Sequence, residues 1–210
     1  KKLLFSSGDD GFLMYGIAGK SWISMGGPFG NEAARTELAW SLRELSDEFG
    51  GWPVFYEIGS EDIPLYLDLG LAVHKLGEKG RVPLVDFSLE GSSRKSMRQV
   101  LSRAERDGCQ FEVVPTEEVG SVLDSLQAIS DAWLAEKNTR EKGFSLGSFQ
   151  PEYIARGPVA VVRQADEIVA FANLWPSAEQ EEVSPDLMRF DPQKAPGGAM
   201  DYLFIESILW

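Results

Sequence analysis

The sequence predicts a mixed α+β fold that is divided into two halves. Apolar stretches with the period of strands alternate with stretches that have the period of helices, so both kinds of element contribute to the core. Several neighbouring strands are separated by short turns, which indicates antiparallel hairpins rather than regular parallel β–α–β units. A strongly basic helix lies between the halves. We therefore expect a first domain at residues 1–91, a connecting helix at 92–108 and a second domain at 109–210.

The composition is that of a folded protein with an acidic balance. The 210 residues are 43% hydrophobic and carry a formal net charge of −13, which argues against a protein that coats nucleic acid indiscriminately. No apolar run approaches the length of about 18 residues that a membrane-spanning helix needs. No signal peptide is visible, so we expect a soluble, cytosolic piece. One cysteine and one histidine argue against a disulfide framework and a Cys/His zinc cluster, and we expect neither a metal nor a cofactor.

The single cysteine and the single histidine are both interpreted as structural residues. Cys109 begins a predicted strand beside Arg106, whose charge would lower the pKa of the thiol. A buried structural thiol is nevertheless the preferred interpretation. His74 follows Gly70 in a predicted strand, without the Ser or Cys motif that a catalytic base would serve.

The first half has the signals of a hairpin, a long helix and a further strand. Apolar alternation predicts strands at 12–17 and 21–25, joined by a turn that contains Gly19. Asn31 is a good helix N-cap, and Gly50–Gly51 ends the helical pattern that follows it. The remaining elements are a strand at 52–58, a short helix at 60–71 and a strand at 82–87.

The helix at 92–108 concentrates the positive charge of the chain. Residues 94–106 hold five bases and one acid, so the rest of the chain carries a net charge of −17. An apolar seam recurs at i, i+3, i+4 and i+7, opposite the basic residues. Ser92 or Ser93 can cap the start of the helix and Gly108 its end. Two interpretations are open: a solvated surface helix, or a surface for a polyanion such as RNA or the phosphates of a membrane. The basic residues are Arg94, Lys95, Arg98, Arg103 and Arg106, and the seam consists of Met97, Val100, Leu101 and Ala104.

The second half repeats the order of strands and helices of the first half, although the two amino-acid sequences are not similar. A strand at 109–115 precedes a long helix at 116–138, and the loop after it contains a short helix at 150–155. Strands at 159–163 and 168–175 form a hairpin with its turn at 165–166. The last elements are a strand at 181–190, a loop and a helix at 200–210. Because this helix has no end cap, we expect Trp210 to be a fragment boundary.

The strand, loop and helix at 183–210 form the best candidate site. The loop at 194–199 is a degenerate match to the pyrophosphate-binding loop of acetyltransferases, R/Q-x-x-G-x-G/A, and it opens a helix whose free N–H groups suit an anion. An ordinary loop is the alternative. Asp186 and Arg189 would point to opposite faces of a regular strand, whereas a bulge near Pro185 would bring them together. A surface charge pair is the alternative for these two residues.

A set of motifs occurs in a fixed order along the chain. The motifs are GSSRKSMRQVLSRAERDGCQFEVVP at 91–115, KGFSLGSF at 142–149, PVAVVR followed by FANLWPS at 158–177, and SPDLMRFDPQKAPGGAMDYLF at 184–204. In this order and spacing they resemble the C-terminal catalytic domain of the bacterial aminoacyl-phosphatidylglycerol synthases, the MprF-type lysyl and alanyl transferases. The resemblance covers the whole chain, including FSSGDDGFLMYG and the GGPFG loop near the start. We assign that loop no role, because Gly27 stands where the family commonly has Asp.

The resemblance implies a fold, a reaction and a set of partners. It implies tandem GNAT (acetyltransferase-like) domains separated by a positively charged helix, with the second domain truncated at Trp210. The implied reaction passes a lysyl or alanyl group from aminoacyl-tRNA to a glycerol hydroxyl of phosphatidylglycerol, which changes lipid charge and gives resistance to cationic antimicrobial peptides. Family members also carry an N-terminal membrane-embedded flippase region, which would place this part at the cytoplasmic face of the bacterial membrane.

The resemblance also suggests roles for individual residues. Asp186 would bind the aminoacyl ammonium or assist deprotonation of the lipid hydroxyl, and Arg189 would pair with a phosphate. The five bases of the helix at 92–108 would engage the tRNA backbone or the anionic membrane surface. Transesterification needs no metal and no redox cofactor, in keeping with one cysteine and one histidine.

Three rival functions stay open at this stage. A CoA-dependent N-acyltransferase would share the fold and the glycine loop, and a tRNA-dependent peptidoglycan-branching enzyme would share the donor. A non-enzymatic module would dock to a membrane surface or to RNA through the basic helix alone. Within the implied reaction, a lysyl group would favour an extra acidic contact and an alanyl group a small pocket.

Overall fold

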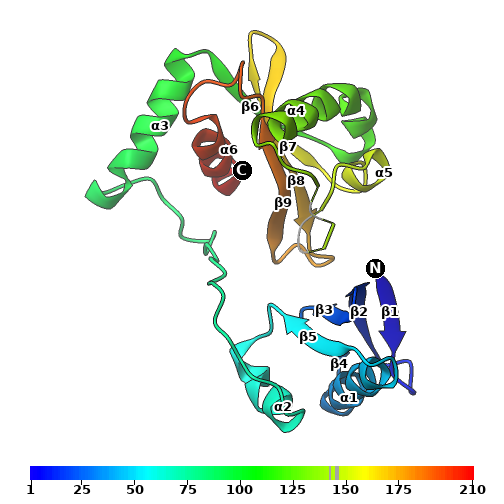
Figure 1. The fold of residues 1–210 in the computed structure, drawn as a ribbon. Helices are drawn as coiled ribbons and strands as arrows, with labels where there is room; N and C mark the ends of the chain where they lie inside the picture. The colour runs from blue at the N-terminus through cyan, green and yellow to red at the C-terminus, as the bar shows by residue number, and fades with distance from the viewer. Residues whose placement is uncertain (142, 145–146) are drawn as a thin grey trace. The chain divides into compact units, whose positions relative to one another are not determined.

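The computed structural model has a mixed α/β fold and describes residues 1–141, 143–144 and 147–210. It divides into two compact units, Lys1–Lys79 and Gly80–Trp210 (Figure 1). Each unit contains one sheet with helices packed on it. The helix predicted at 92–108 lies within the second unit.

The sheet of the first unit combines an antiparallel meander with one parallel pair. Its strand order is β1–β2–β3–β5, and the short strand β4 also pairs with β2. The predicted hairpin at β2 and β3 is confirmed, whereas β1 was not predicted. The parallel pairing of β3 and β5 follows from the helix α1 that connects them. The bounds are β1 Lys2–Phe5, β2 Gly11–Ala18, β3 Ser21–Met25, β4 Phe29–Gly30, α1 Glu32–Glu48 and β5 Trp52–Tyr56.

The helices of the first unit begin and end close to the predicted positions. The side chain of Asn31 accepts a hydrogen bond from the backbone N–H of Ala34 at 2.9 Å, which confirms the predicted N-cap. Leu38 and Leu42 of α1 are fully buried against the sheet residues Leu13 and Trp22. The predicted helix at 60–71 is a 3-10 turn at Ser60–Asp62 followed by α2 at Ile63–Asp68.

The strand predicted at 82–87 is wrong. Residues 82–84 and 87 have no regular secondary structure, residues 85–86 form a turn, and the side chain of Val85 is 97% exposed. The apolar residues of this segment have the pattern of a strand, but no described strand pairs with it. A strand needs a neighbouring strand to form hydrogen bonds with its backbone N–H and C=O groups. His74 was also expected in a strand. It lies instead in the irregular segment before residue 82, and its side chain is exposed.

The second unit has an antiparallel sheet in the order β6–β7–β8–β9. Its central strands are almost completely buried, because helices cover both faces. The predicted hairpin of β7 and β8 is confirmed, and its two turn residues, Ala165 and Asp166, have φ of +47° and +67°. Two positive φ values in a two-residue turn match the twist of a hairpin. The bounds are β6 Cys109–Val114, β7 Val159–Gln164, β8 Glu167–Pro176 and β9 Val183–Phe190.

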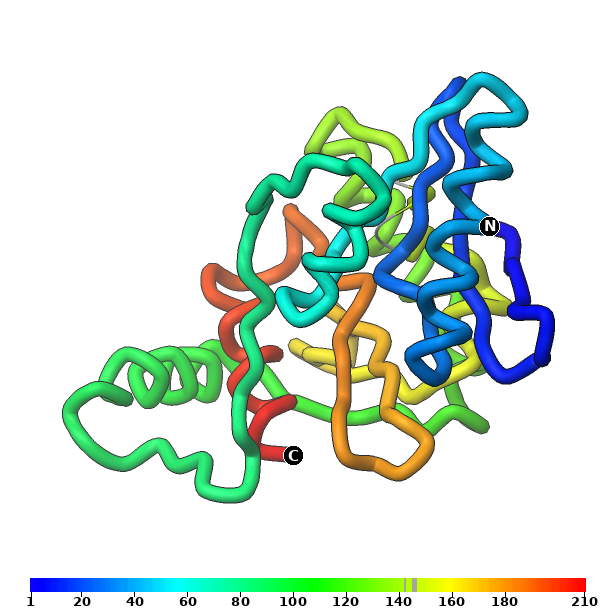
Figure 2. The backbone as a smooth tube through the Cα atoms, turned by 90° about the horizontal axis from the view of Figure 1, so that it is seen from below, coloured from blue at the N-terminus to red at the C-terminus, as the bar shows by residue number. Residues whose placement is uncertain are grey.

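Two layers of helices enclose this sheet. On one face, α4 and α5 pack against Val161, Phe171 and Leu187. On the other face, α6 and the basic helix α3 pack against a cluster that includes Val162 and Leu174. α3 and α6 lie side by side in both views (Figures 1 and 2). The bounds are α3 Lys95–Arg106, α4 Leu123–Glu136, α5 Pro151–Ile154 and α6 Ala199–Leu209.

The basic helix has the predicted amphipathic arrangement. Ala104 is buried, and Val100 and Leu101 pack against the same core. Gly108 has φ +76°, the left-handed conformation expected after a helix end. The expected serine cap is wrong, because neither the 3-10 turn at Ser92–Arg94 nor α3 has a side-chain cap hydrogen bond.

Loss of the Asn31 cap should destabilise the first unit. Asn31→Ala leaves an N–H group of the first helical turn without its acceptor, which costs about 1 kcal/mol, whereas Asn31→Ser keeps a capping oxygen and should cost less. Hydrogen exchange of the α1 amide groups measures the difference. Equal exchange rates in the alanine variant and the unmodified chain would contradict this role of Asn31.

Candidate functional site

A bulge in β9 organises the candidate site. Met188 pairs with Ala172 and Pro185 pairs with Leu174, so β9 has one more residue than β8 between these two pairs. The buried side chain of Asn173 accepts a hydrogen bond from the backbone N–H of Leu187 at 2.7 Å inside this irregularity. The bulge suggested by the sequence near Pro185 is therefore present. It changes the alternation of the strand, and both Asp186 and Arg189 contact the segment at 141–153.

Asp186 is held by two groups from the loop and α5. Both of its carboxylate oxygens lie 3.1 Å from the backbone N of Gly147, which donates to them. The hydroxyl of Tyr153 donates to Oδ2 at 2.5 Å. Position 147 requires glycine for this approach, since a Cβ there would collide with the Asp186 carboxylate. Burial, together with the hydrogen bond to Asp186 and its negative charge, raises the pKa of Tyr153 to about 12.

Arg189 is buried and paired. Its guanidinium donates to both carboxylate oxygens of Glu141, at 2.9 and 2.6 Å, and also to the hydroxyl of Ser130. The guanidinium carbon lies 5.2 Å from the ring centroid of Trp133, a cation–π geometry. Burial acts to raise the pKa of Glu141, but hydrogen bonds from Arg189 and the Phe149 N–H, with the charge of Arg189, outweigh it and lower that pKa.

The two predicted residues are thus brought to one segment of the chain, each with its own partners. Asp186 offers carboxylate oxygens fixed by neutral donors, which suits an ammonium group. Arg189 offers a guanidinium already shared with a carboxylate, so an anionic ligand there would share it with Glu141. Three residues of the motif at 142–149, numbers 142, 145 and 146, lie outside the described residues.

Sequence reasoning missed four side chains that contact Asp186 or Arg189. They lie on α4, on α5 and in the loop between them, far along the chain from β9. The only signal in the sequence was the position of two of them beside the motif at 142–149: Glu141 directly precedes this motif, and Tyr153 follows it. The missed residues are Ser130, Trp133, Glu141 and Tyr153.

The five basic side chains of α3 differ in their contacts. Arg98 donates to the backbone carbonyl of Gly91 at 2.9 Å and also to that of Leu89, and Arg94 lies 5.0 Å from the ring centroid of Phe87. These two arginines therefore hold the segment that leads into the helix. The other three bases are Lys95, Arg103 and Arg106, all with exposed side chains.

The start of α6 lies beside α3 and forms a small cavity. The cavity has a volume of about 360 Å³ and is lined by Arg103, Asp107 and the predicted glycine loop. Gly198 has φ +93° and precedes the first helical residue, Ala199, with no side-chain cap. Arg103 also lies 3.6 Å from Asp107, so the cavity holds both signs of charge.

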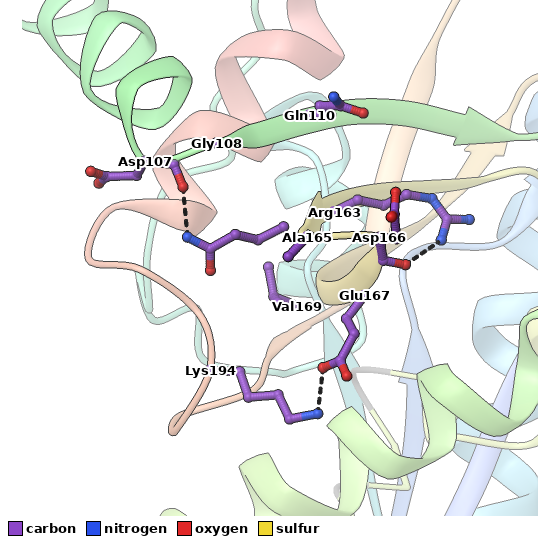
Figure 3. A pocket seen from close by; sticks show the side chains of 10 residues that line it. Asp107, Gly108, Gln110, Arg163, Ala165, Asp166, Glu167, Val169 and Lys194 are labelled. Atoms are coloured by element: carbon purple, nitrogen blue, oxygen red, sulfur yellow. Dashed lines mark hydrogen bonds and ion pairs between the residues drawn. The ribbon is translucent and has the colours of Figure 1, made fainter.

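A larger cavity lies at the end of the β7–β8 hairpin and contains none of the predicted catalytic residues (Figure 3). Its volume is about 740 Å³. Four of its polar residues pair with one another: Lys194 with Glu167 at 2.6 Å, and the Gln164 amide with the Asp107 carbonyl at 2.7 Å. We assign it no ligand.

Cys109 behaves as a structural residue. The side chain is buried, and burial, with a smaller contribution from the charge of Asp107, raises the pKa of its thiol. The expectation that Arg106 would lower this pKa is therefore wrong. Within the described ranges, no three His, Cys, Asp or Glu side chains are grouped as a metal site would require. None of the described helices is both long and apolar enough to cross a bilayer.

Comparison with known families gives a match along the whole chain. The family model described as "Phosphatidylglycerol lysyltransferase, C-terminal" matches residues 1–210. The chain belongs to this family. It is 37% identical to the phosphatidylglycerol lysyltransferase of Bacillus subtilis and 31% identical to that of Staphylococcus aureus. The alignments cover all of this chain but only 24% and 25% of those proteins, so the chain spans about a quarter of these curated relatives.

Two solved structures of family members have the same fold. The C-terminal domain of a putative lysylphosphatidylglycerol synthetase from Agrobacterium fabrum is 44% identical with a TM-score of 0.92, and the match covers 99% of this chain and 65% of that one. The L-PGS structure from Bacillus licheniformis is 36% identical with a TM-score of 0.89, and the match covers 100% and 66%. The resemblance inferred from the motifs is confirmed.

The contact between Tyr153 and Asp186 can be tested by titration. Asp186→Asn should lower the pKa of Tyr153 from about 12 toward its ordinary value of 10, because it removes the neighbouring negative charge while burial remains. Nuclear magnetic resonance of isotope-labelled tyrosine measures this pKa. Tyr66, whose pKa of about 12 arises mainly from burial in the first unit, serves as an internal control and should not change. An unchanged Tyr153 would contradict the contact.

Proposed function

We propose that this chain is part of a catalytic domain that transfers a lysyl group from lysyl-tRNA to phosphatidylglycerol. The observation that carries the proposal is the placement of Asp186 and Arg189, both within the motif at 184–204, against one segment of the second unit. The names of the relatives support phosphatidylglycerol as acceptor and lysine as the transferred group. They favour this reaction over CoA-dependent acylation, peptidoglycan branching and alanyl transfer.

The proposed chemistry is a transesterification. The glycerol hydroxyl oxygen of the lipid attacks the carbonyl carbon of the lysyl ester, and the bond from that carbon to the ribose oxygen of the tRNA breaks. The hydroxyl proton ends on the departing ribose oxygen, directly or through a base. No net oxidation occurs. The protein's contribution is to hold the two substrates in line and to stabilise the charge that develops on the carbonyl oxygen.

Asp186 is proposed to bind the ammonium group of the lysyl ester. Donors from Gly147 and Tyr153 fix its carboxylate in position, which leaves an ordered acceptor for a cation. Acceptance of the lipid hydroxyl proton is the alternative role of the same side chain. Both roles require the carboxylate to be ionised, and Asp186→Asn removes both.

Arg189 is proposed to pair with a phosphate, which would share the buried guanidinium with Glu141. The guanidinium is already oriented by Glu141 and Ser130, so little side-chain freedom is lost when a phosphate binds. Part of the guanidinium charge is balanced by Glu141, which makes the interaction with a phosphate weaker than that of an unpaired arginine.

The wider organisation is proposed to follow the family. Two GNAT domains, at residues 1–91 and 109–210, would be joined by the helix at 92–108, and an N-terminal flippase region of the complete protein would hold them at the cytoplasmic face of the membrane. The exposed bases of α3 would bind the tRNA backbone or the anionic lipid surface. The acidic character of the remaining chain would confine the polyanion to this helix.

Substitution of the two central residues should abolish transfer. In the complete catalytic domain, Asp186→Asn and Arg189→Ala should each lower the rate of labelled lysine transfer into the lipid fraction by about 100-fold or more, because each removes a charge that is proposed to hold a substrate in position. Asp166→Asn, an exposed acid in the β7–β8 turn, is the matched control and should be neutral. Full activity of Asp186→Asn in a folded protein would contradict the assignment.

Charge reversal on the basic helix should weaken binding of tRNA and flatten its salt dependence. Each lost phosphate contact lowers the slope of log affinity against log salt by about 0.7–0.9, so Lys95→Glu and Arg106→Glu together should lower it by up to about 1.8. Lys137→Glu, an exposed base at the end of α4, is the control. An unchanged slope in the double variant would exclude a direct role of these two bases.

A further inference from the structure

Trp175 lies beside the candidate site and carries a polar group without a partner. It is on β8, four residues after Phe171, and alternate residues of a strand share a face, so its side chain points to the face covered by α4 and α5. The indole N–H is buried, and in the part of the chain that the structure describes it has no hydrogen-bond partner. Buried donors of this kind are rare in folded proteins, because burial removes the water that would otherwise accept from them.

The rings of Trp175 and Tyr153 pack against each other. Their centroids are 5.1 Å apart and the ring planes are inclined by 39°, within the range of favourable aromatic pairs. The hydroxyl of the same tyrosine donates to Oδ2 of Asp186 at 2.5 Å. Trp175 therefore contacts a residue that holds the carboxylate proposed to bind the ammonium group.

The environment of Tyr153 indicates where the indole N–H points. Burial is the main reason why the pKa of Tyr153 is raised to about 12, and the hydrogen bond to Asp186 and its charge raise it further. Trp175 and Asn173 act in the opposite direction, as donors near the phenol oxygen, because a donor stabilises the phenolate. The indole N–H thus lies near the phenol oxygen, although it forms no hydrogen bond of normal geometry with it.

We propose that Trp175 is a positioning residue for the lysyl transfer: its ring fixes the phenol of Tyr153, and its N–H donates to the phenol oxygen when that oxygen becomes more negative. The inference rests on the proposed function. The oxygen becomes more negative as the phenol shares its proton with the carboxylate of Asp186. A phenol that accepts a hydrogen bond is also a stronger donor. Through Tyr153, Trp175 therefore strengthens the contact that holds the Asp186 carboxylate in place for the substrate ammonium.

Titration of Tyr153 in the complete catalytic domain tests the contact. A ring-fluorinated tyrosine, whose phenol is more acidic than that of tyrosine, brings the titration into an accessible range, and fluorine nuclear magnetic resonance follows it. Trp175→Phe keeps an aromatic ring and removes the N–H, so we expect the pKa at position 153 to rise by about one pH unit, because the phenolate loses a donor. Looser packing alone would admit water and lower this pKa. An unchanged or lowered pKa would overturn the proposal.

A closer analogue of tryptophan separates the N–H from the shape of the ring. Benzothienylalanine at position 175 keeps the two-ring shape and has sulfur in place of the N–H. It should raise the pKa at position 153 as Trp175→Phe does, and it provides the same test if the phenylalanine variant does not fold. Trp40→Phe, in α1 of the first unit, is the matched control, because its side chain is 42% exposed, and it should change neither the pKa nor the transfer rate.

Transfer of labelled lysine to phosphatidylglycerol tests the role in the reaction. We expect Trp175→Phe to lower kcat/KM by about tenfold, because the carboxylate of Asp186 is held less firmly. A raised pKa at position 153 together with an unchanged kcat/KM would overturn the positioning role. Absence of transfer in the unmodified catalytic domain would instead contradict the proposed function, and the titration of Tyr153 does not depend on that activity.

Discussion

The candidate site depends on one hydrogen bond, from the backbone N–H of Leu187 to the side chain of Asn173. A bulge leaves an unpaired backbone group inside a sheet, and a buried group without a partner costs about 1–3 kcal/mol. Asn173, itself 1% exposed, supplies that partner. In a regular strand, Asp186 and Arg189 would point to opposite faces. With the bulge, both contact residues from the α4–α5 layer.

The rest of the site is built on that layer. Glu141 holds the guanidinium of Arg189, which is 4% exposed, and accepts a second hydrogen bond from the N–H of Phe149. Arg189 is buried whereas Glu141 is 30% exposed, so loss of Glu141 would leave a buried charge without its partner, and the pair therefore fixes the loop to β9. Tyr153 and Gly147 hold the carboxylate of Asp186 by donating hydrogen bonds to it. The site therefore connects the strand to the loop, and each of its two charged groups has a structural partner.

Sequence reasoning predicted the elements of the fold better than the contacts of the site. The strongly periodic segments, such as α1 with its Asn31 cap and the β7–β8 hairpin, were correct within a few residues. The strand at 82–87 failed because its apolar pattern says nothing about whether a neighbour is present to pair with it. Asp186 and Arg189 were proposed from the predicted strand that holds them, but their partners Glu141 and Tyr153 were not predicted, because pairing across 33 to 48 residues leaves no periodic signal in the chain.

The lysyl transfer rate of the Asn173→Ala variant tests the central claim most directly, since Asn173 has no proposed contact with substrate. Removal of its amide leaves the Leu187 N–H unpaired and also removes a hydrogen bond to Tyr153, so it loosens the bulge and the group that holds Asp186, while the residues Asp186 and Arg189 themselves are kept. We expect the complete catalytic domain to fold, the Leu187 amide to exchange faster, and transfer of labelled lysine to phosphatidylglycerol to fall by about tenfold or more, as positioning effects do. Fast exchange at Leu187 together with an unchanged transfer rate would contradict the claim that the bulge assembles the site.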